Sequence, residues 1–350
     1  PMSGIFGTFC NSIHTQDKNK KKLILWNNAY GRDAKQIFEK NNIQIGCCLQ
    51  MLATHTTTSP ILHMNSMYAA IDLLLYNREE LIIKCNAPTS ISDEELLLSY
   101  LTQFGMSALK DVNGDFSGVI YDENAQTLTL FRDHMGIRPL YYYADNSFMA
   151  FSTDIRGLLG LDGVDSSLNE DWIYRTLSGY FVDSVTSTEY QNIFCVSPAS
   201  YITFSIKNEK ISQEIHSYWQ LGKKKIHYTS FELYKAKLKE LVTDSIQRRL
   251  QAIPGKAGAE LSGGLDSGVI GILIHRLGRD CVYFSWSVDP NEIPYADHDE
   301  RLIIKDICKQ EHIQCHYSQM KSDRSMNSLL ARQMQSLGFS LDENEPPALR

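Results

Sequence analysis

Six residues, Ser262-Gly-Gly-Leu-Asp-Ser267, constrain the fold of this chain more than any other segment. They follow a short apolar stretch at 257–261 and precede an apolar run at 268–275, which is the pattern of a strand, a loop and a helix. Adjacent glycines allow a tight turn whose backbone N–H groups approach an anion, and a helix N-terminus adds positive potential there. No lysine follows the glycines, so the motif differs from the GxxxxGK[ST] loop. The segment therefore predicts a phosphate-binding loop of another kind.

The residues around this motif alternate between strand-like and helix-like patterns. We expect strands at 257–261, 282–288 and 313–318, with helices at 267–277 and 299–310. Strands that alternate with helices form a parallel sheet, and ligands bind beyond the carboxyl ends of its strands. The C-terminal part is therefore predicted to be an α/β domain with the loop at its ligand-binding edge.

A long helix is expected before the first of these strands. Thr229-Ser-Phe-Glu232 has the form of a capping box, and apolar residues recur at helical spacing beyond it. The apolar face predicted from that spacing consists of Leu238, Leu241, Val242, Ile246 and Leu250. The polar segment 220–228 is interpreted as a linker, so the predicted domains are 2–219 and 229–350.

The first domain has a different pattern, with many short β-segments separated by turn residues. The expected strands are 4–9, 68–75, 116–121, 127–132, 140–144 and 200–206. Two helices interrupt them, at 93–104 and 169–177. This mixture predicts an α+β arrangement of packed layers.

Composition excludes several classes of protein. A net charge of −7 without a large basic cluster disfavours nucleic acid or an anionic membrane as partner. No apolar stretch reaches the length of a membrane span, and the eight cysteines form no CxxC pair. We therefore expect a cytoplasmic protein with reduced thiols.

Pro1 before Met2 is typical of the remnant of a cleaved tag, so the natural chain is expected to start at Met2.

The 262–267 motif resembles the pyrophosphate loop of the asparagine synthetase superfamily, whose domain is adenine nucleotide α-hydrolase-like. Those enzymes split ATP between its α and β phosphates and form an acyl-adenylate that an amine attacks. The resemblance implies ATP and magnesium as cofactors, with Asp266 as a magnesium ligand. The candidate nucleotide-binding residues are Leu261, Ser262, Gly263, Gly264, Leu265, Asp266, Ser267, Ser285 and Trp286. For Ser285 and Trp286 an ordinary strand end is an equally good interpretation. For the acidic pair Asp299-Glu300, favourable charge at a helix N-terminus is the simpler one.

The first domain resembles the class II glutamine amidotransferase half of asparagine synthetase. The similar segments are Met2–Gly7, Asn113–Phe116, Arg132–Tyr142 and Phe151–Asp154. The resemblance implies an Ntn-hydrolase-like fold of sandwiched antiparallel sheets with helices. Arg132 and Asp133 are expected to hold the fold rather than to act in catalysis.

One position departs from that family's pattern. A cysteine follows the initiator methionine in the family and attacks glutamine, whereas Ser3 occupies that position here. A serine hydroxyl is a much weaker nucleophile without a strong base, so no catalytic residue is predicted in the glutaminase site. Natural loss and an engineered substitution are both open on this residue alone.

Two further positions indicate natural loss. The family has an Asn-Gly-Glu-Ile-Tyr-Asn segment that binds the amino acid end of glutamine, and Asp72–Asn77 replaces its glycine and glutamate with leucines. An arginine for the glutamine carboxylate has no counterpart in Gly46–Met51. Asp93 matches a family position, but an acidic residue at a helix N-terminus explains it as well. We therefore expect an inactive glutaminase.

Without glutamine, the amine must come from the substrate itself. This situation resembles β-lactam synthetases and lasso-peptide macrolactam synthetases, and the segments Met2–Ile5 and Ala259–Ser267 look more like the latter. That resemblance implies a peptide substrate, with a leader-binding protein and a leader protease as partners. The alternatives are a glutamine-dependent asparagine synthetase with Ser3 in place of its nucleophile, and a non-catalytic nucleotide-binding or regulatory homologue. The family's second acidic loop is not found before Arg350, so either the chain is a fragment or another polypeptide supplies the remainder.

Overall fold

The computed structural model describes residues 2–10, 16–179, 185–223, 225–295 and 299–318. The chain divides into two compact units, Pro1–Lys224 and Lys225–Arg350, and each is described by itself. Among the described residues, no helix is both long and apolar enough to cross a membrane.

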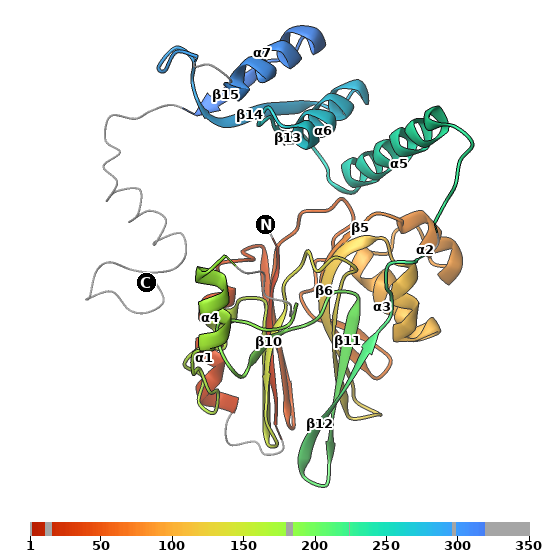
Figure 1. The fold of residues 1–350 in the computed structure, drawn as a ribbon. Helices are drawn as coiled ribbons and strands as arrows, with labels where there is room; N and C mark the ends of the chain where they lie inside the picture. Colours follow the sequence, from red (N-terminus) through yellow and green to blue (C-terminus); the bar gives the residue numbers. More distant parts are fainter. Residues whose placement is uncertain (1, 11–15, 180–184, 224, 296–298, 319–350) are drawn as a thin grey trace. The chain divides into compact units, whose positions relative to one another are not determined.

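Unit 1 contains two six-stranded antiparallel sheets (Figure 1). The first has the order β10-β8-β9-β1-β3-β2. Its strands are β1 (Gly4–Cys10), β2 (Ala34–Lys40), β3 (Ile43–Leu49), β8 (Tyr141–Ala144), β9 (Phe148–Ser152) and β10 (Ile193–Cys195). The second has the order β12-β11-β7-β6-β5-β4. Its strands are β4 (Leu62–Met64), β5 (Met67–Leu75), β6 (Gly114–Asp122), β7 (Thr127–Arg132), β11 (Ser200–Lys207) and β12 (Lys210–Ser217).

The two sheets pack against each other through an apolar layer. Ile5 of β1 and Val119 of β6 belong to this layer. The next residue of β1, Phe6, points to the other face and packs with Leu23 of α1 (Gln16–Asn27). Because side chains alternate along a strand, β1 is apolar on both faces and buried throughout. The predicted sandwich of antiparallel sheets with helices is confirmed.

Two helices cover the outer face of the second sheet. These are α2 (Arg78–Cys85) and α3 (Asp93–Phe104), and their buried leucines pack with residues of β5 and β6 (Figure 1). The predicted bounds of α3 are confirmed, because Ser92 and Glu95 form a full capping box at its start. A further helix, α4 (Glu170–Leu177), follows later in the chain.

Unit 2 contains a parallel sheet of order β13-β14-β15 among the described residues (Figure 1). Its strands are β13 (Ala257–Glu260), β14 (Cys281–Val288) and β15 (Cys315–Ser318). The helices α6 (Leu265–Arg276) and α7 (Glu300–Glu311) alternate with them, and α5 (Phe231–Ala252) precedes them. The predicted α/β pattern is confirmed.

Two details predicted for α5 are wrong. The N-cap is Ser230, whose hydroxyl accepts a hydrogen bond from the Leu233 amide, rather than Thr229. Leu238 and Leu241 are 64% and 54% exposed, so only part of the predicted apolar face is buried. Periodicity identifies which residues share a face, but it does not tell whether another element covers that face.

Candidate functional site

The 262–267 loop lies at the carboxyl end of β13. The Leu261 amide donates to the Phe284 carbonyl oxygen over 2.8 Å, so the chain leaves the sheet beside the end of β14. Leu261 is fully buried and anchors the start of the loop in the core of unit 2. The loop is therefore at the edge of a parallel sheet where ligands bind in such folds.

Two serines close the loop on itself. The Ser262 and Ser267 hydroxyls lie 2.8 Å apart, and the Ser267 hydroxyl also accepts from the Ser262 amide over 3.1 Å. The Gly264 amide donates to the Ser262 hydroxyl over 3.3 Å. These bonds fix the shape of the loop before any ligand binds.

The N-terminus of α6 has open hydrogen-bond donors. Its N-cap is Gly264, which has no side chain to cap the helix, whereas Ser230 caps α5 and Asp299 caps α7. Within the described part of the chain, the amides of Leu265, Asp266 and Ser267 have no acceptor. Amides in the first turn of a helix cannot bond within the helix, so they can bind a phosphate group.

Gly263 gives the loop its turn. Its φ is +78°, and a Cβ atom there would lie 2.6 Å from the Glu300 carbonyl oxygen. A side chain at this position would therefore be strained and would collide with the start of α7. The close approach places the first residues of α7 directly against the loop.

The remaining predicted nucleotide-binding residues differ in exposure. Asp266 is exposed, and no ion pair joins it to another described residue, so its carboxylate is free to meet a magnesium ion beside bound phosphates. Leu265 is 82% exposed and Trp286 75% exposed, while Ser285 is buried and its hydroxyl accepts from the Ser287 amide. No group of three metal-ligating side chains lies together in the described parts of the chain. The ligand roles of these residues stay predictions.

Ser3 of unit 1 is buried, and its polar groups are already bonded. Its amide donates to Asp72 Oδ1 over 2.9 Å, and its hydroxyl accepts from the Gln50 amide over 3.1 Å. Asp72 Oδ2 lies 3.4 Å from Arg138 Nε, and both of these side chains are buried. Burial raises the pKa of the Asp72 carboxyl, while Arg138 and the Ser3 amide act in the opposite direction. The arrangement is a buried polar network in which both the amide and the side chain of Ser3 interact with Asp72.

The segment predicted to have lost its glutamine contacts is apolar in the structure. Leu73 and Leu74 are buried on β5, and Leu73 packs in the layer beneath α3. In the segment Gly46–Met51, where the family's arginine has no counterpart, the Gln50 side-chain amide and the Met51 backbone amide donate to the Asp33 carboxylate over 2.9 and 2.7 Å. Neither segment 72–77 nor segment 46–51 contains an arginine or lysine that could pair with the carboxylate of a free amino acid.

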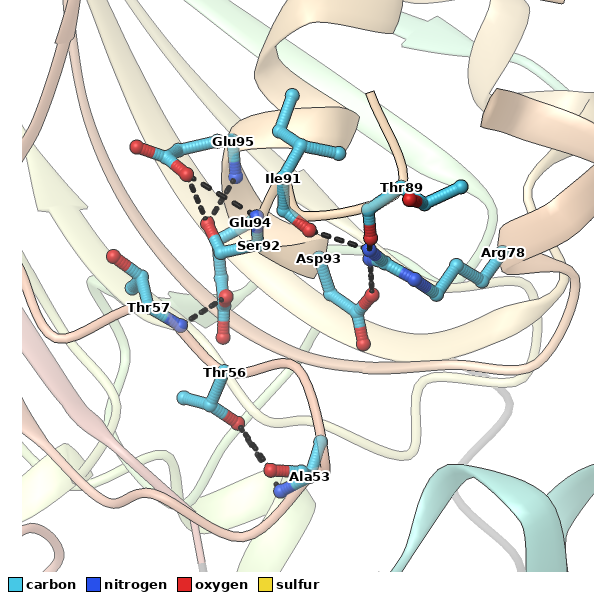
Figure 2. Close-up of polar contacts among 10 residues, drawn as sticks. All are labelled: Ala53, Thr56, Thr57, Arg78, Thr89, Ile91, Ser92, Asp93, Glu94 and Glu95. Atoms are coloured by element: carbon cyan, nitrogen blue, oxygen red, sulfur yellow. Dashed lines mark hydrogen bonds and ion pairs between the residues drawn. The ribbon is translucent and has the colours of Figure 1, made fainter. Parts of the chain in front are cut away.

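The start of α3 contains two buried carboxylates (Figure 2). Asp93 forms an ion pair with Arg78, which also donates to the backbone of Thr89 and Ile91. Asp93 lies in the acidic first turn of α3, as predicted, and its charge is in addition paired with Arg78. The partner lies fifteen residues earlier on α2, which no local pattern indicates.

Glu94 is the second of these carboxylates, and the sequence did not single it out. It accepts a hydrogen bond from the Thr57 amide over 2.8 Å (Figure 2). Burial raises the pKa of Glu94 to about 7, and the like charges of Asp93 and Asp72 add to the increase. Glu94 thus ties the 53–57 segment to α3.

Arg132 and Asp133 hold the fold, as predicted. The Asp133 carboxylate accepts hydrogen bonds from the backbone amides of Met135, Ile137 and Arg138 within its own turn. Arg132 donates to backbone carbonyl oxygens in the same turn and to that of Val196. Both side chains are therefore used in stabilising the turn after β7.

Comparison with known families agrees with this geometry. Residues 2–219 match the model of a glutamine amidotransferase domain, and residues 237–338 match the asparagine synthase model. The first match alone covers more than half of the chain. The chain belongs to the asparagine synthetase family. Its two units thus correspond to the two domain models of that family.

Several curated proteins are similar in sequence. A putative glutamine-hydrolysing asparagine synthetase 2 of Methanocaldococcus jannaschii is 28% identical over 68% of this chain and 46% of that protein. The glutamine-hydrolysing asparagine synthetase 3 of Bacillus subtilis is 29% identical over 61% of this chain and 33% of that protein. The amidase chry2 of Gibberella zeae is 30% identical over 53% of this chain and 27% of that protein. The chain spans less than half the length of each of these relatives.

Proposed function

We propose that this chain provides the nucleotide-binding loop of an ATP-dependent amide-forming ligase. The ligase activates a carboxylate as its adenylate, releases pyrophosphate and joins the acyl group to an amine. The observation that supports this proposal is the open N-terminus of α6, where three amides without an acceptor in the described chain face a preformed glycine turn. A departing pyrophosphate is the anion that such a site would bind.

The chemistry required of the loop is electrostatic. A carboxylate that approaches the α-phosphate of ATP meets negative charge, and fixed donors at the polyphosphate reduce that repulsion. The amides of Leu265, Asp266 and Ser267 would bind the pyrophosphate oxygens, while the serine pair keeps the turn in shape. A magnesium ion bound through Asp266 would neutralise part of the remaining charge.

The amine is proposed to belong to the substrate. Ser3 is bonded within a buried network, and Leu73 and Leu74 occupy the positions that should bind glutamine. The finer proposal is closure of a lasso-type peptide through its N-terminal amine and a side-chain carboxylate. A leader-binding protein and a leader protease would then be partners. Holding both reacting groups on one enzyme makes ring closure unimolecular, worth on the order of 7–11 kcal/mol of the barrier.

A direct experiment combines the complete enzyme, including any polypeptide that supplies the remainder of the site, with candidate peptides, ATP and magnesium. We expect AMP to form and the peptide to lose the mass of one water, with Asp266→Asn reducing both. AMP release that depends on added glutamine would contradict the proposal. Peptide-independent exchange of labelled pyrophosphate into ATP with free aspartate would also contradict it.

A glutamine-dependent asparagine synthetase is the second candidate. Two of the relatives are named as glutamine-hydrolysing asparagine synthetases, which favours it. Glutamate release by a Ser3→Cys variant would support this candidate. ATP binding without any pyrophosphate exchange would instead support a non-catalytic regulatory role.

A further inference from the structure

Arg301 is a buried arginine at the start of α7. It is 7% exposed, and its guanidinium group uses all of its N–H donors. Nε donates to both oxygens of Asp299 over 2.9 Å, and Nη2 bonds the same carboxylate. Nη1 donates to the carbonyl oxygens of Val288 and Ile293 over 2.8 and 2.9 Å, and Nη2 to that of Pro294 over 3.1 Å. The planar, five-donor geometry of arginine is needed for such a set, and lysine cannot reproduce it.

The carbonyl acceptors belong to the last residue of β14, Val288, and to the segment that follows it. Because β13 and β14 are parallel neighbours, this segment leaves the same edge of the sheet as the 262–267 loop. Arg301 thus fixes residues 288–294 to the N-cap of α7, and the charge of Asp299 compensates its own. Buried charges that are paired and fully bonded hold a single geometry.

The N-terminus of α7 in turn contacts the phosphate loop. Gly263 approaches the backbone of Glu300 so closely that no side chain fits between them. The Glu300 carboxylate accepts a hydrogen bond from the Ser287 hydroxyl over 2.9 Å, which links it to the end of β14. A series of contacts therefore connects the segment after β14 with the glycine turn, through Arg301 and then Glu300.

We infer that Arg301 is a positioning residue for nucleotide binding. It keeps the 288–294 segment and the first turn of α7 as a rigid wall beside the 262–267 loop, without touching the nucleotide itself. This inference rests on the proposed function of that loop. Replacing Arg301 is therefore expected to weaken ATP binding because the 262–267 loop changes its geometry, and not because a contact with ATP is lost.

The test measures ATP–magnesium binding to the full chain by calorimetry, together with amide hydrogen exchange. Arg301→Lys is expected to weaken binding about tenfold and to accelerate exchange at 289–293 and 263–267, with β13 and β14 unchanged. Arg276→Lys is the matched control, because Arg276 also pairs with a carboxylate, Glu311, but is exposed at the opposite end of α6. It should change neither quantity.

Asp299→Asn provides a second, milder variant, since asparagine keeps the N-cap and removes only the charge. It should weaken ATP binding less than Arg301→Lys. Unchanged affinity in both variants, with the parent chain binding ATP, would overturn the inference alone. Faster exchange throughout β13 and β14 would also overturn it, by showing general unfolding. Failure of the parent chain to bind ATP would overturn the proposed function as well.

Discussion

The two polar sites of this molecule contain similar groups in opposite states. Around Ser3, the amide and hydroxyl are bonded to Asp72 and the Gln50 amide, and Asp72 is paired with Arg138. Around Ser262, the serines bond each other and leave the amides of the next helical turn without acceptors in the described chain. The groups of the first site bond and pair with one another, whereas the second site has donors that are open to an anion.

This contrast shows why residue types alone do not identify a ligand site. Buried polar groups are nearly always bonded, so a network that satisfies itself contributes to stability and specificity of the fold. Donors that the fold leaves open at a helix N-terminus are available to a ligand. We therefore expect changes around Ser3 to affect stability and changes around Ser262 to affect binding.

The largest effect is expected for Asp72→Asn. The change removes the negative charge that Arg138 pairs with, and breaking a buried ion pair from one side typically costs 3–5 kcal/mol. The 3.4 Å contact is looser than a hydrogen bond, so we expect the free energy of unfolding of unit 1 to fall by about 3 kcal/mol. Denaturant unfolding measures this loss, and ATP binding should not change.

Asp171→Asn is the control for that variant. Asp171 pairs with Arg175 over 2.9 Å, but both side chains are exposed on α4. Exposed ion pairs contribute less than about 1 kcal/mol. Equal losses in the two variants would show that the Ser3 network is no more structural than a surface pair.

A binding defect is expected for Gly263→Ala. Its φ of +78° costs alanine about 1–2 kcal/mol, and the new Cβ would also collide with the Glu300 carbonyl oxygen. We expect ATP affinity to fall by about 10- to 100-fold, which is roughly 1.4–2.8 kcal/mol.

Gly278→Ala separates strain from collision. Gly278 has a φ of +72° in the same unit, but no atom lies within 4 Å of its added Cβ. The strain of a positive φ should lower the free energy of unfolding of Gly278→Ala by a similar amount. Its ATP affinity, measured by calorimetry, should not change. If the two variants bound ATP with equal affinity, the 262–267 loop would not be part of the nucleotide site.

A smaller effect is expected from Glu94 through pH. Because its pKa is raised to about 7 from 4.5, the folded chain binds this proton more tightly than the unfolded chain. The resulting stability is complete below about pH 4.5 and is lost as the pH rises toward 7. Glu94→Gln should remove this decline, so that between about pH 5 and pH 8 the variant loses on the order of 2 kcal/mol less than the parent.

Urea unfolding at several pH values measures that slope. Glu79→Gln on the neighbouring helix α2 is a control, since Glu79 is exposed. If Glu94→Gln retained the full slope, the titration would have to come from Asp93 or Asp72, whose pKa values burial also raises.

The sequence predicted features that depend on local pattern. The bounds of α3 were predicted from the helical spacing of its apolar residues, and the glycine turn from its motif. The cap of α5 was placed one residue early, because Thr229 and Ser230 are both good caps and only the backbone geometry distinguishes them.

Features that depend on distant segments were not predicted. Asp93 pairs with Arg78, Glu94 bonds the Thr57 amide, and Arg301 binds carbonyl oxygens that precede it by up to thirteen residues. Each of these groups has a simpler local interpretation as part of a helix start. Backbone acceptors leave no signal in the sequence, so a buried arginine that binds them looks like any surface arginine.

The smallest effect is expected for Ser3→Cys, which supplies a stronger nucleophile to the closed site. Segments 72–77 and 46–51 still contain no arginine or lysine for the glutamine carboxylate, and the residue 3 amide remains bonded to Asp72. We expect no glutamate release above that of the parent chain, by a coupled assay, and a change in unfolding free energy within about 0.5 kcal/mol. Measurable hydrolysis would mean that the polar network opens to admit glutamine, and the distinction between a closed and an open site would fail for unit 1.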